Sequence, residues 1–115
     1  MKKDDFVYLM HIRDAILRIE EYTKGVRYDD FMNINLVQAG VMREIEILGE
    51  ATKRLSKEIK AKYPDIPWRK MAGMRDKLIH DYFGVDLDAI GDTVERDIPS
   101  LKNSIKNIIE KEEKL

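Results

Sequence analysis

The sequence has no cysteine, and it contains only two histidines and three prolines among its 115 residues. Without cysteine the chain has no disulfide, no thiol nucleophile and no zinc site of the cysteine type. This composition is compatible with a reducing cytosol, so we expect a cytoplasmic protein. His11 and His80 fall in different predicted helices, and no Glu-x-x-His pair is present, so we expect no metal site and no other cofactor.

Long hydrophobic runs are absent as well. No apolar segment approaches the roughly 18–20 residues that span a membrane, and residues 1–5 lack the apolar centre of a signal peptide. Hydrophobic residues nevertheless make up 43% of the chain, which is too many for a disordered protein. We therefore expect one folded domain over residues 1–115 and no membrane association.

Apolar residues recur at three- and four-residue steps along the chain, with no alternating strand pattern and no hairpin signal. We predict an all-α fold, an antiparallel bundle of four or five helices. The first helix should be capped by Asp4 and Asp5 and should stop at Gly25, and a loop should follow over residues 26–35. The other helices are expected over residues 35–63, 67–83, 86–98 and 99–114, with Pro99 starting the last one.

The predicted helices are amphipathic. The second helix contains two glycines, Gly40 and Gly49, each of which costs about 1 kcal/mol relative to alanine in a helix. We therefore expect a close approach by a packed neighbour at both positions. The apolar stripe of the first helix is Phe6, Leu9, Ile12, Ile16 and Ile19, and that of the second is Val37, Val41, Ile45, Leu48, Leu55 and Ile59.

The net charge of -1 conceals an uneven distribution. Residues 53–80 carry nine cationic and three anionic side chains, which gives this segment +6 and leaves -7 for the rest of the chain. A basic segment on an acidic body is a possible footprint for a polyanion. A solvated helix face with pairs such as Glu50–Arg54 explains the same charges, and charge alone favours this second interpretation.

The segment around His80 contains several candidate catalytic side chains close together in the sequence. Asp76 and His80 are four residues apart, so a continuous helix would place them on one face, where the carboxylate could orient the imidazole. Arg75 and His80 would differ by about 140° on the same helix. Either the helix loosens near His80, or a second copy of the chain completes the site, which would predict a homodimer with the segment at its two-fold axis.

An arginine with a histidine suits RNA cleavage without a metal. An imidazole can take the proton of a ribose 2′-hydroxyl or give one to the leaving 5′-oxygen, and a guanidinium can stabilise the charge on the phosphate. The structural alternative is a surface Arg75–Asp76 pair, a helix-terminal His80 and a half-buried Tyr82, and the residues alone leave both open. We interpret His11 as an ordinary surface histidine.

Arg75, followed by four residues and then His80, Asp81 and Tyr82, resembles the Arg-x4-His-x-Tyr motif of HEPN domains, specifically of the HepT-like toxin family. The resemblance extends over nearly the whole chain, in the order expected for the family. The flanking segments that carry it are Leu48-Gly49-Glu50-Ala51, Leu55-Ser56, Pro64-x-Ile66-Pro67-Trp68, Gly73-Met74-Arg75 and Asp97-Ile98-Pro99-x-Leu101.

The resemblance implies a HEPN-type bundle that forms a homodimer with its site at the interface. It implies a metal-independent endoribonuclease, the toxin of a toxin–antitoxin pair, whose partner is a minimal nucleotidyltransferase antitoxin. Arg75 and His80 would be the catalytic pair and Asp76 would support them. The antitoxin would attach AMP to Tyr82, adding charge and bulk that block RNA entry. Gly91 departs from the family pattern, where a large aromatic is expected, and puts the local packing in question.

Two other functions remain open at this level. The chain could be a non-catalytic helical subunit that binds nucleotide or substrate for a minimal nucleotidyltransferase. It could also be a generic helical interaction domain in which Arg75 and His80 are incidental. RNA cleavage that persists in EDTA and is lost on changing His80 would distinguish the ribonuclease from both of these non-catalytic functions.

Overall fold

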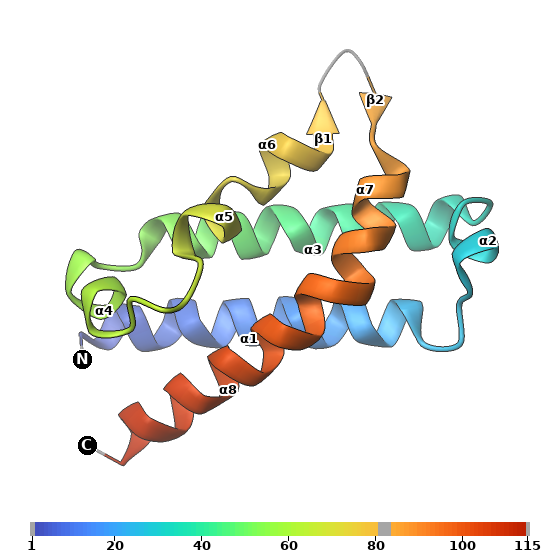
Figure 1. The fold of residues 1–115 in the computed structure, drawn as a ribbon. Helices are drawn as coiled ribbons and strands as arrows, with labels where there is room; N and C mark the ends of the chain where they lie inside the picture. The colour runs from blue at the N-terminus through green and yellow to red at the C-terminus, as the bar shows by residue number, and fades with distance from the viewer. Residues whose placement is uncertain (1, 81–83, 115) are drawn as a thin grey trace.

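Two long helices form the frame of the molecule. The computed structural model describes residues 2–80 and 84–114, with the backbone alone at positions 79, 80, 84 and 85. Figure 1 shows α1 (Lys3–Thr23) and α3 (Asn35–Arg54) antiparallel and side by side, with the chain from α7 to α8 crossing them. The other elements are α2 (Tyr28–Phe31), α4 (Lys57–Lys62), α5 (Trp68–Ala72), α6 (Met74–Leu78), β1 (Ile79–His80), β2 (Gly84–Val85), α7 (Leu87–Asp92), the π-helical η1 (Thr93–Asp97) and α8 (Ile98–Glu113).

The prediction of a helical bundle is confirmed. The exception is a pair of two-residue strands, β1 and β2, which are antiparallel with His80 opposite Gly84. Aliphatic side chains at helical spacing form one core, which is why the amphipathic stripes predicted these helices. The stripe residues that are almost fully buried are Leu9, Ile12, Ile16 and Ile19 of α1 and Val41, Ile45 and Leu48 of α3.

The helix predicted over residues 35–63 is broken in two at Leu55 and Ser56. The cause is Asp5, whose buried carboxylate accepts hydrogen bonds from the Ser56 backbone N–H (2.8 Å) and from the Ser56 hydroxyl (2.6 Å). The Ser56 hydroxyl in turn accepts a bond from the Ile59 N–H and caps α4. The expectation that Asp4 and Asp5 cap the first helix is therefore wrong, since both lie inside its first turn and the N-cap, Lys2, has no side-chain cap bond.

The C-terminal region also differs from the prediction of two helices separated at Pro99. Asp97 and Ile98 keep right-handed helical dihedral angles, so α7, η1 and α8 form one continuous helical run. Proline cannot donate the backbone hydrogen bond of a helix interior, and its ring crowds the preceding turn. The wide π-helical turn ends at Asp97, two residues before Pro99, and thus lies in the turn that the proline ring would crowd.

Two glycines are explained by aromatic neighbours. A Cβ atom at Gly40 would lie 2.9 Å from Cδ2 of Tyr22, so this glycine admits the tyrosine ring between α1 and α3. A Cβ at Gly91 would lie 3.3 Å from Cε2 of Tyr28. The family pattern predicts a large aromatic side chain at position 91. Here the Tyr28 ring of α2 occupies that space. Gly25 has a positive φ of 72° after α1, as the predicted helix stop requires.

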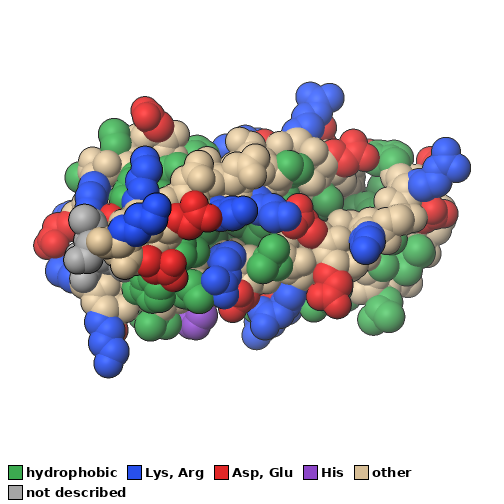
Figure 2. Space-filling view, turned by 90° about the horizontal axis from the view of Figure 1, so that it is seen from below, with side chains coloured by type: hydrophobic (Ala, Val, Ile, Leu, Met, Phe, Trp, Pro, Cys, Tyr) green, Lys and Arg blue, Asp and Glu red, His purple; other side chains and the backbone are tan. Residues whose placement is uncertain are grey.

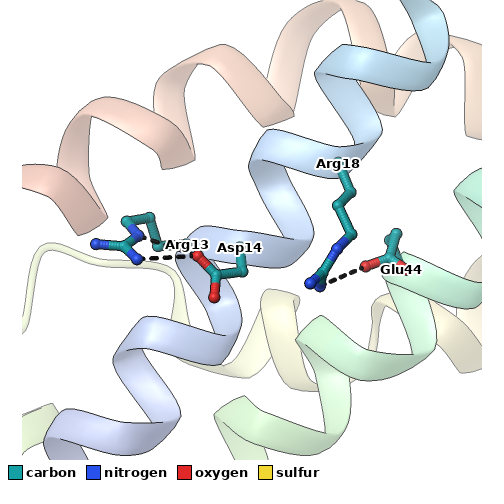
Figure 3. A network of polar contacts seen from close by, with 4 residues as sticks. All are labelled: Arg13, Asp14, Arg18 and Glu44. Atoms are coloured by element: carbon teal, nitrogen blue, oxygen red, sulfur yellow. Dashed lines mark hydrogen bonds and ion pairs between the residues drawn. The ribbon is translucent and has the colours of Figure 1, made fainter.

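Ion pairs join the helices outside the core. Figure 3 shows Arg18 of α1 reaching Glu44 of α3, with 3.5 Å between Nη1 and Oε1, while Arg13 and Asp14 pair within α1. The Glu44 side chain is only 6% exposed, so Arg18 offsets the cost of burying its charge. Lys102 of α8 pairs in the same way with Glu20 of α1 at 2.8 Å.

The surface is strongly charged and of mixed sign. Figure 2, which views the molecule from below Figure 1, shows Lys and Arg side chains interspersed with Asp and Glu over this face. Such mixing gives this face no large field of a single sign. In residues 2–80 and 84–114, no helix combines the length and the apolar character needed to cross a membrane.

A buried carboxylate fastens α8 to α4. The Glu112 side chain is 1% exposed, and its Oε2 accepts bonds from Lys62 Nζ (2.8 Å) and from the Tyr63 hydroxyl (2.7 Å). The Lys62 ammonium is the main cause that lowers the pKa of Glu112. Burial, followed by the bond to Glu112, raises the pKa of Tyr63 from 10.0 to about 12. Both shifts favour an ionised Glu112 beside a neutral Tyr63.

We predict that Asp5→Ala lowers the free energy of unfolding by about 1–3 kcal/mol, because two buried hydrogen bonds to Ser56 are lost. Asp4→Ala is the matched control, since it also removes a carboxylate from the first turn of α1 but changes an exposed side chain. Urea unfolding followed by circular dichroism measures both. Equal losses in the two variants would show that the helix dipole, and not the Ser56 contact, is responsible.

We predict that the contacts of neutral Tyr63 stabilise the fold fully below pH 10 and that this stabilisation is lost as the pH rises toward about 12. Tyr63→Phe should therefore cost about 1–3 kcal/mol at pH 8 and less at pH 11. Tyr22→Phe, at a half-exposed tyrosine of α1, is the control. A Tyr63→Phe loss that is constant between pH 8 and 11 would contradict this assignment.

Candidate functional site

A groove of about 670 Å³ lies between α1, the second half of α3 and the α5–α6 segment. It contains Arg75 and Asp76, two of the residues that the sequence assigns to the site. Its floor includes Gly49 and Ala51 of α3 and Ala72 of α5. The polar and aromatic side chains that line it are Tyr8, His11, Arg43, Glu46, Glu50, Lys53, Arg54, Arg75 and Asp76.

Arg75 reaches the groove because its neighbours on α6 are anchored in the core. Met74 and Leu78 are buried one turn apart, which leaves Arg75 on an adjacent face of the helix. The distance from Arg75 Nη1 to Asp76 Oδ1 is 3.5 Å, and the Arg75 side chain is 37% exposed. Asp76 thus contacts Arg75 at the edge of the groove.

Gly49 brings this segment close to α3. A Cβ at Gly49 would lie 3.4 Å from the Ala72 carbonyl oxygen and 3.5 Å from that of Met71, so the backbone of α5 packs directly on α3. Trp68 fixes the other end of α5, where its indole N–H donates to the carbonyl oxygens of Tyr63 (2.9 Å) and Lys60 (3.2 Å). The close approach expected at Gly49 is therefore confirmed, and it sets the position of α6.

His80 does not continue the helix. α6 ends at Leu78, and the backbone of His80 is extended in β1, paired with Gly84 of β2. The hairpin is extended by a bond from the Asp86 N–H to the Leu78 carbonyl oxygen (3.0 Å). The placement of Asp76 and His80 on one face of a continuous helix is thus wrong, and the alternative of a helix that loosens before His80 is confirmed. Tyr82 lies outside the described residues.

Two residues of the groove are not among those that the sequence motif assigns to the site. Tyr8 and His11 come from α1, and their rings meet edge to face with centroids 6.1 Å apart. His11 is exposed, as expected for a surface histidine, but the surface on which it lies is the wall of the groove that holds Arg75. Position in the sequence gives no sign of this, because α1 and α6 are brought together only by their common packing on α3.

The groove is less basic than residues 53–80 as a whole. Of the nine cations in that segment only Lys53, Arg54 and Arg75 line it, and three acidic side chains lie among them. Arg54 bonds Glu50 at 3.3 Å. The Tyr8 hydroxyl first, and Glu50 second, raise the pKa of Arg54 above its ordinary value.

Metal ligands do not gather here. In the part of the chain that the structure describes, no three histidine or carboxylate side chains are grouped closely enough to hold a metal ion. The groove instead offers guanidinium groups for an anion, a carboxylate beside one of them and an aromatic pair. This donor set suits a phosphate with an attached flat ring.

The helical bundle with Arg75 on an open groove belongs to a known class of proteins. Residues 12–108 match the family model described as "Ribonuclease HepT-like". The chain therefore belongs to the HepT-like ribonuclease family, and the resemblance stated from its motif is confirmed. No solved structure was found to match the chain.

Curated relatives agree with this membership. A protein of Thermococcus cleftensis named "Probable ribonuclease HepT" is 46% identical over 108 residues, which cover 94% of this chain and 98% of that protein. A Methanocaldococcus jannaschii protein named "Gamma-glutamylcyclotransferase and putative RNase MJ0434" is 49% identical over 114 residues. This match covers 99% of this chain, but the chain spans only about half of that protein (51%).

We predict that Gly49→Val lowers the free energy of unfolding by about 1–3 kcal/mol, because its methyl groups would press on the α5 carbonyl oxygens. Gly49→Ala is the control. Its Cβ fits at 3.4 Å, and alanine favours a helix by about 1 kcal/mol over glycine, so this variant should be at least as stable as the parent in urea unfolding. If Gly49→Val unfolds at the same urea concentration as Gly49→Ala, α5 does not pack on α3 as described.

Proposed function

We propose that the protein is a metal-independent endoribonuclease that cleaves RNA with Arg75 and His80, and that it is the toxin of a toxin–antitoxin pair. The observation that carries the proposal is the placement of Arg75 on an open groove, with β1 and His80 beginning directly after the same short helix. Membership of the HepT-like family supports RNA as the substrate.

In the proposed reaction, the 2′-oxygen of a ribose attacks the adjacent phosphorus and the bond from phosphorus to the 5′-oxygen breaks. His80 takes the 2′-hydroxyl proton or gives a proton to the leaving 5′-oxygen, as an imidazole near neutral pKa does. Arg75 donates to the phosphate oxygens, on which negative charge develops. Asp76, 3.5 Å from Arg75, holds the guanidinium toward the phosphate.

We propose that the active form is a homodimer in which the two copies of the motif face each other. The reaction needs both a proton acceptor and a proton donor, and one copy brings a single histidine in the motif. Two copies of β1 at a two-fold axis would supply both. The grooves of the two protomers would then form one continuous surface for the RNA strand.

The proposed partner is a minimal nucleotidyltransferase antitoxin that transfers AMP to Tyr82. Tyr82 follows His80 by two residues, so a modification there would add a phosphate charge and an adenosine close to the catalytic histidine. Negative charge and bulk at this point would repel and obstruct the RNA backbone. The modification would thus inhibit cleavage without unfolding the toxin.

RNA cleavage in the presence of EDTA tests the proposal. Wild-type protein should cut a mixed-sequence RNA, and His80→Ala and Arg75→Ala should each lose at least about a hundredfold in rate, the usual size of acid–base and charge-stabilising contributions. Lys77→Ala is the matched control, because it removes a cation from the same helix that does not line the groove. Equal inactivity of wild type and His80→Ala on varied RNAs would contradict catalysis and favour the non-catalytic partner of a nucleotidyltransferase.

A further inference from the structure

Tyr8 and His11 form an aromatic pair on the wall of the groove opposite α6. Their ring centroids are 6.1 Å apart and their planes meet at 75°, so the rings touch by edge and face and are not stacked on one another. This geometry leaves ring surface for a third flat group. Both residues line the same groove as Arg75.

The core determines that this pair faces the groove. Leu9 and Ile12, next to them in the sequence, are completely buried between α1 and α3. Tyr8 and His11, three residues apart, therefore share the adjoining face of α1. The N-terminal turn of α1 is held by the bonds between Asp5 and Ser56, so the pair is presented on a fixed element.

The surroundings of the pair indicate a nucleic-acid ligand. Arg54, whose Nε bonds Glu50 at 3.3 Å, lines the groove together with Arg43 and Lys53. Proteins that bind single-stranded RNA combine aromatic rings, on which bases stack, with cations that hold the phosphates. The groove contains both kinds of group on different helices, which fits a nucleotide lying across it.

We propose that Tyr8 and His11 bind an unpaired base of the substrate RNA, next to the phosphate that Arg75 contacts. The proposal rests on the proposed ribonuclease function and adds to it a base-binding subsite. The subsite selects single-stranded RNA, because a base in a duplex is stacked on its neighbours and cannot enter the groove. Stacking tolerates every base, so the subsite gives a preference for strandedness and little for sequence.

Binding of a fluorescently labelled single-stranded RNA tests the subsite, in a His80→Ala background that prevents cleavage. His11→Ala and Tyr8→Ala should each weaken binding by about tenfold, the usual effect of losing one stacked base. His11→Phe should restore most of the binding, because a phenyl ring stacks but carries no proton. Tyr22→Ala, which removes an aromatic of α1 outside the groove, should leave binding unchanged.

A double-stranded RNA of the same sequence provides the second measurement. The His11→Ala effect should vanish on the duplex, because no unpaired base is available there. Thermal unfolding and light scattering of every variant show whether the fold and the oligomeric state are preserved. Tyr8→Leu, which removes the ring but keeps an apolar side chain, serves in place of Tyr8→Ala if that variant unfolds.

The outcomes separate the subsite from the enzyme. If wild type cleaves RNA and His11→Ala binds it within twofold of the parent, the subsite is wrong and the ribonuclease stands. If His11→Phe binds RNA no better than His11→Ala, the ring at this position does not stack on a base and the base-binding role is overturned. If wild type neither binds nor cleaves RNA, the proposed function itself fails.

Discussion

The packing of α1 against α3 is the constraint on which the rest of the molecule depends. Each helix buries one aliphatic stripe almost completely, so neither can rotate without exposing part of the core. The faces beside the stripes are fixed at the same time. This is how Tyr8 and His11 of α1 come to share a groove with Arg43 of α3. The third wall depends on a small residue at position 49, because a Cβ there would already be in van der Waals contact with the carbonyl oxygens of α5.

Most of the fold could be predicted from the sequence because it is determined by local periodicity. The stripes of α1 and α3 and the stop at Gly25 depend on residues a few positions apart. The break at Ser56 could not be predicted in this way, since its cause is a carboxylate at Asp5 in a different helix. The run through Pro99 was missed for another reason. Proline usually marks a helix start, and the π-helical turn that accommodates it here has no sequence signature.

The candidate site was predictable in part. Spacing and residue type selected Arg75 and Asp76, and the structure places both in the groove. The end of α6 at Leu78 changes how His80 is presented, because a residue in an extended strand is not held on a helix face. His11 shows the limit of reasoning from neighbours in sequence. Its neighbours on α1 give no sign of a functional role. It lies in the groove because α3 and α6 are placed beside α1 only in the folded chain.

Both ends of the described chain are fastened to the same short helix. The first turn of α1 bonds the N-cap of α4 through Asp5, and the last turn of α8 bonds Lys62 through Glu112. The six residues of α4 span only about 9 Å, and Figure 1 shows both termini at this end of the bundle. The first and last long helices are thus held at one end of the bundle through α4. Loosening this short helix would release α1 and α8 at the same time, although α4 itself contributes no residue to the groove.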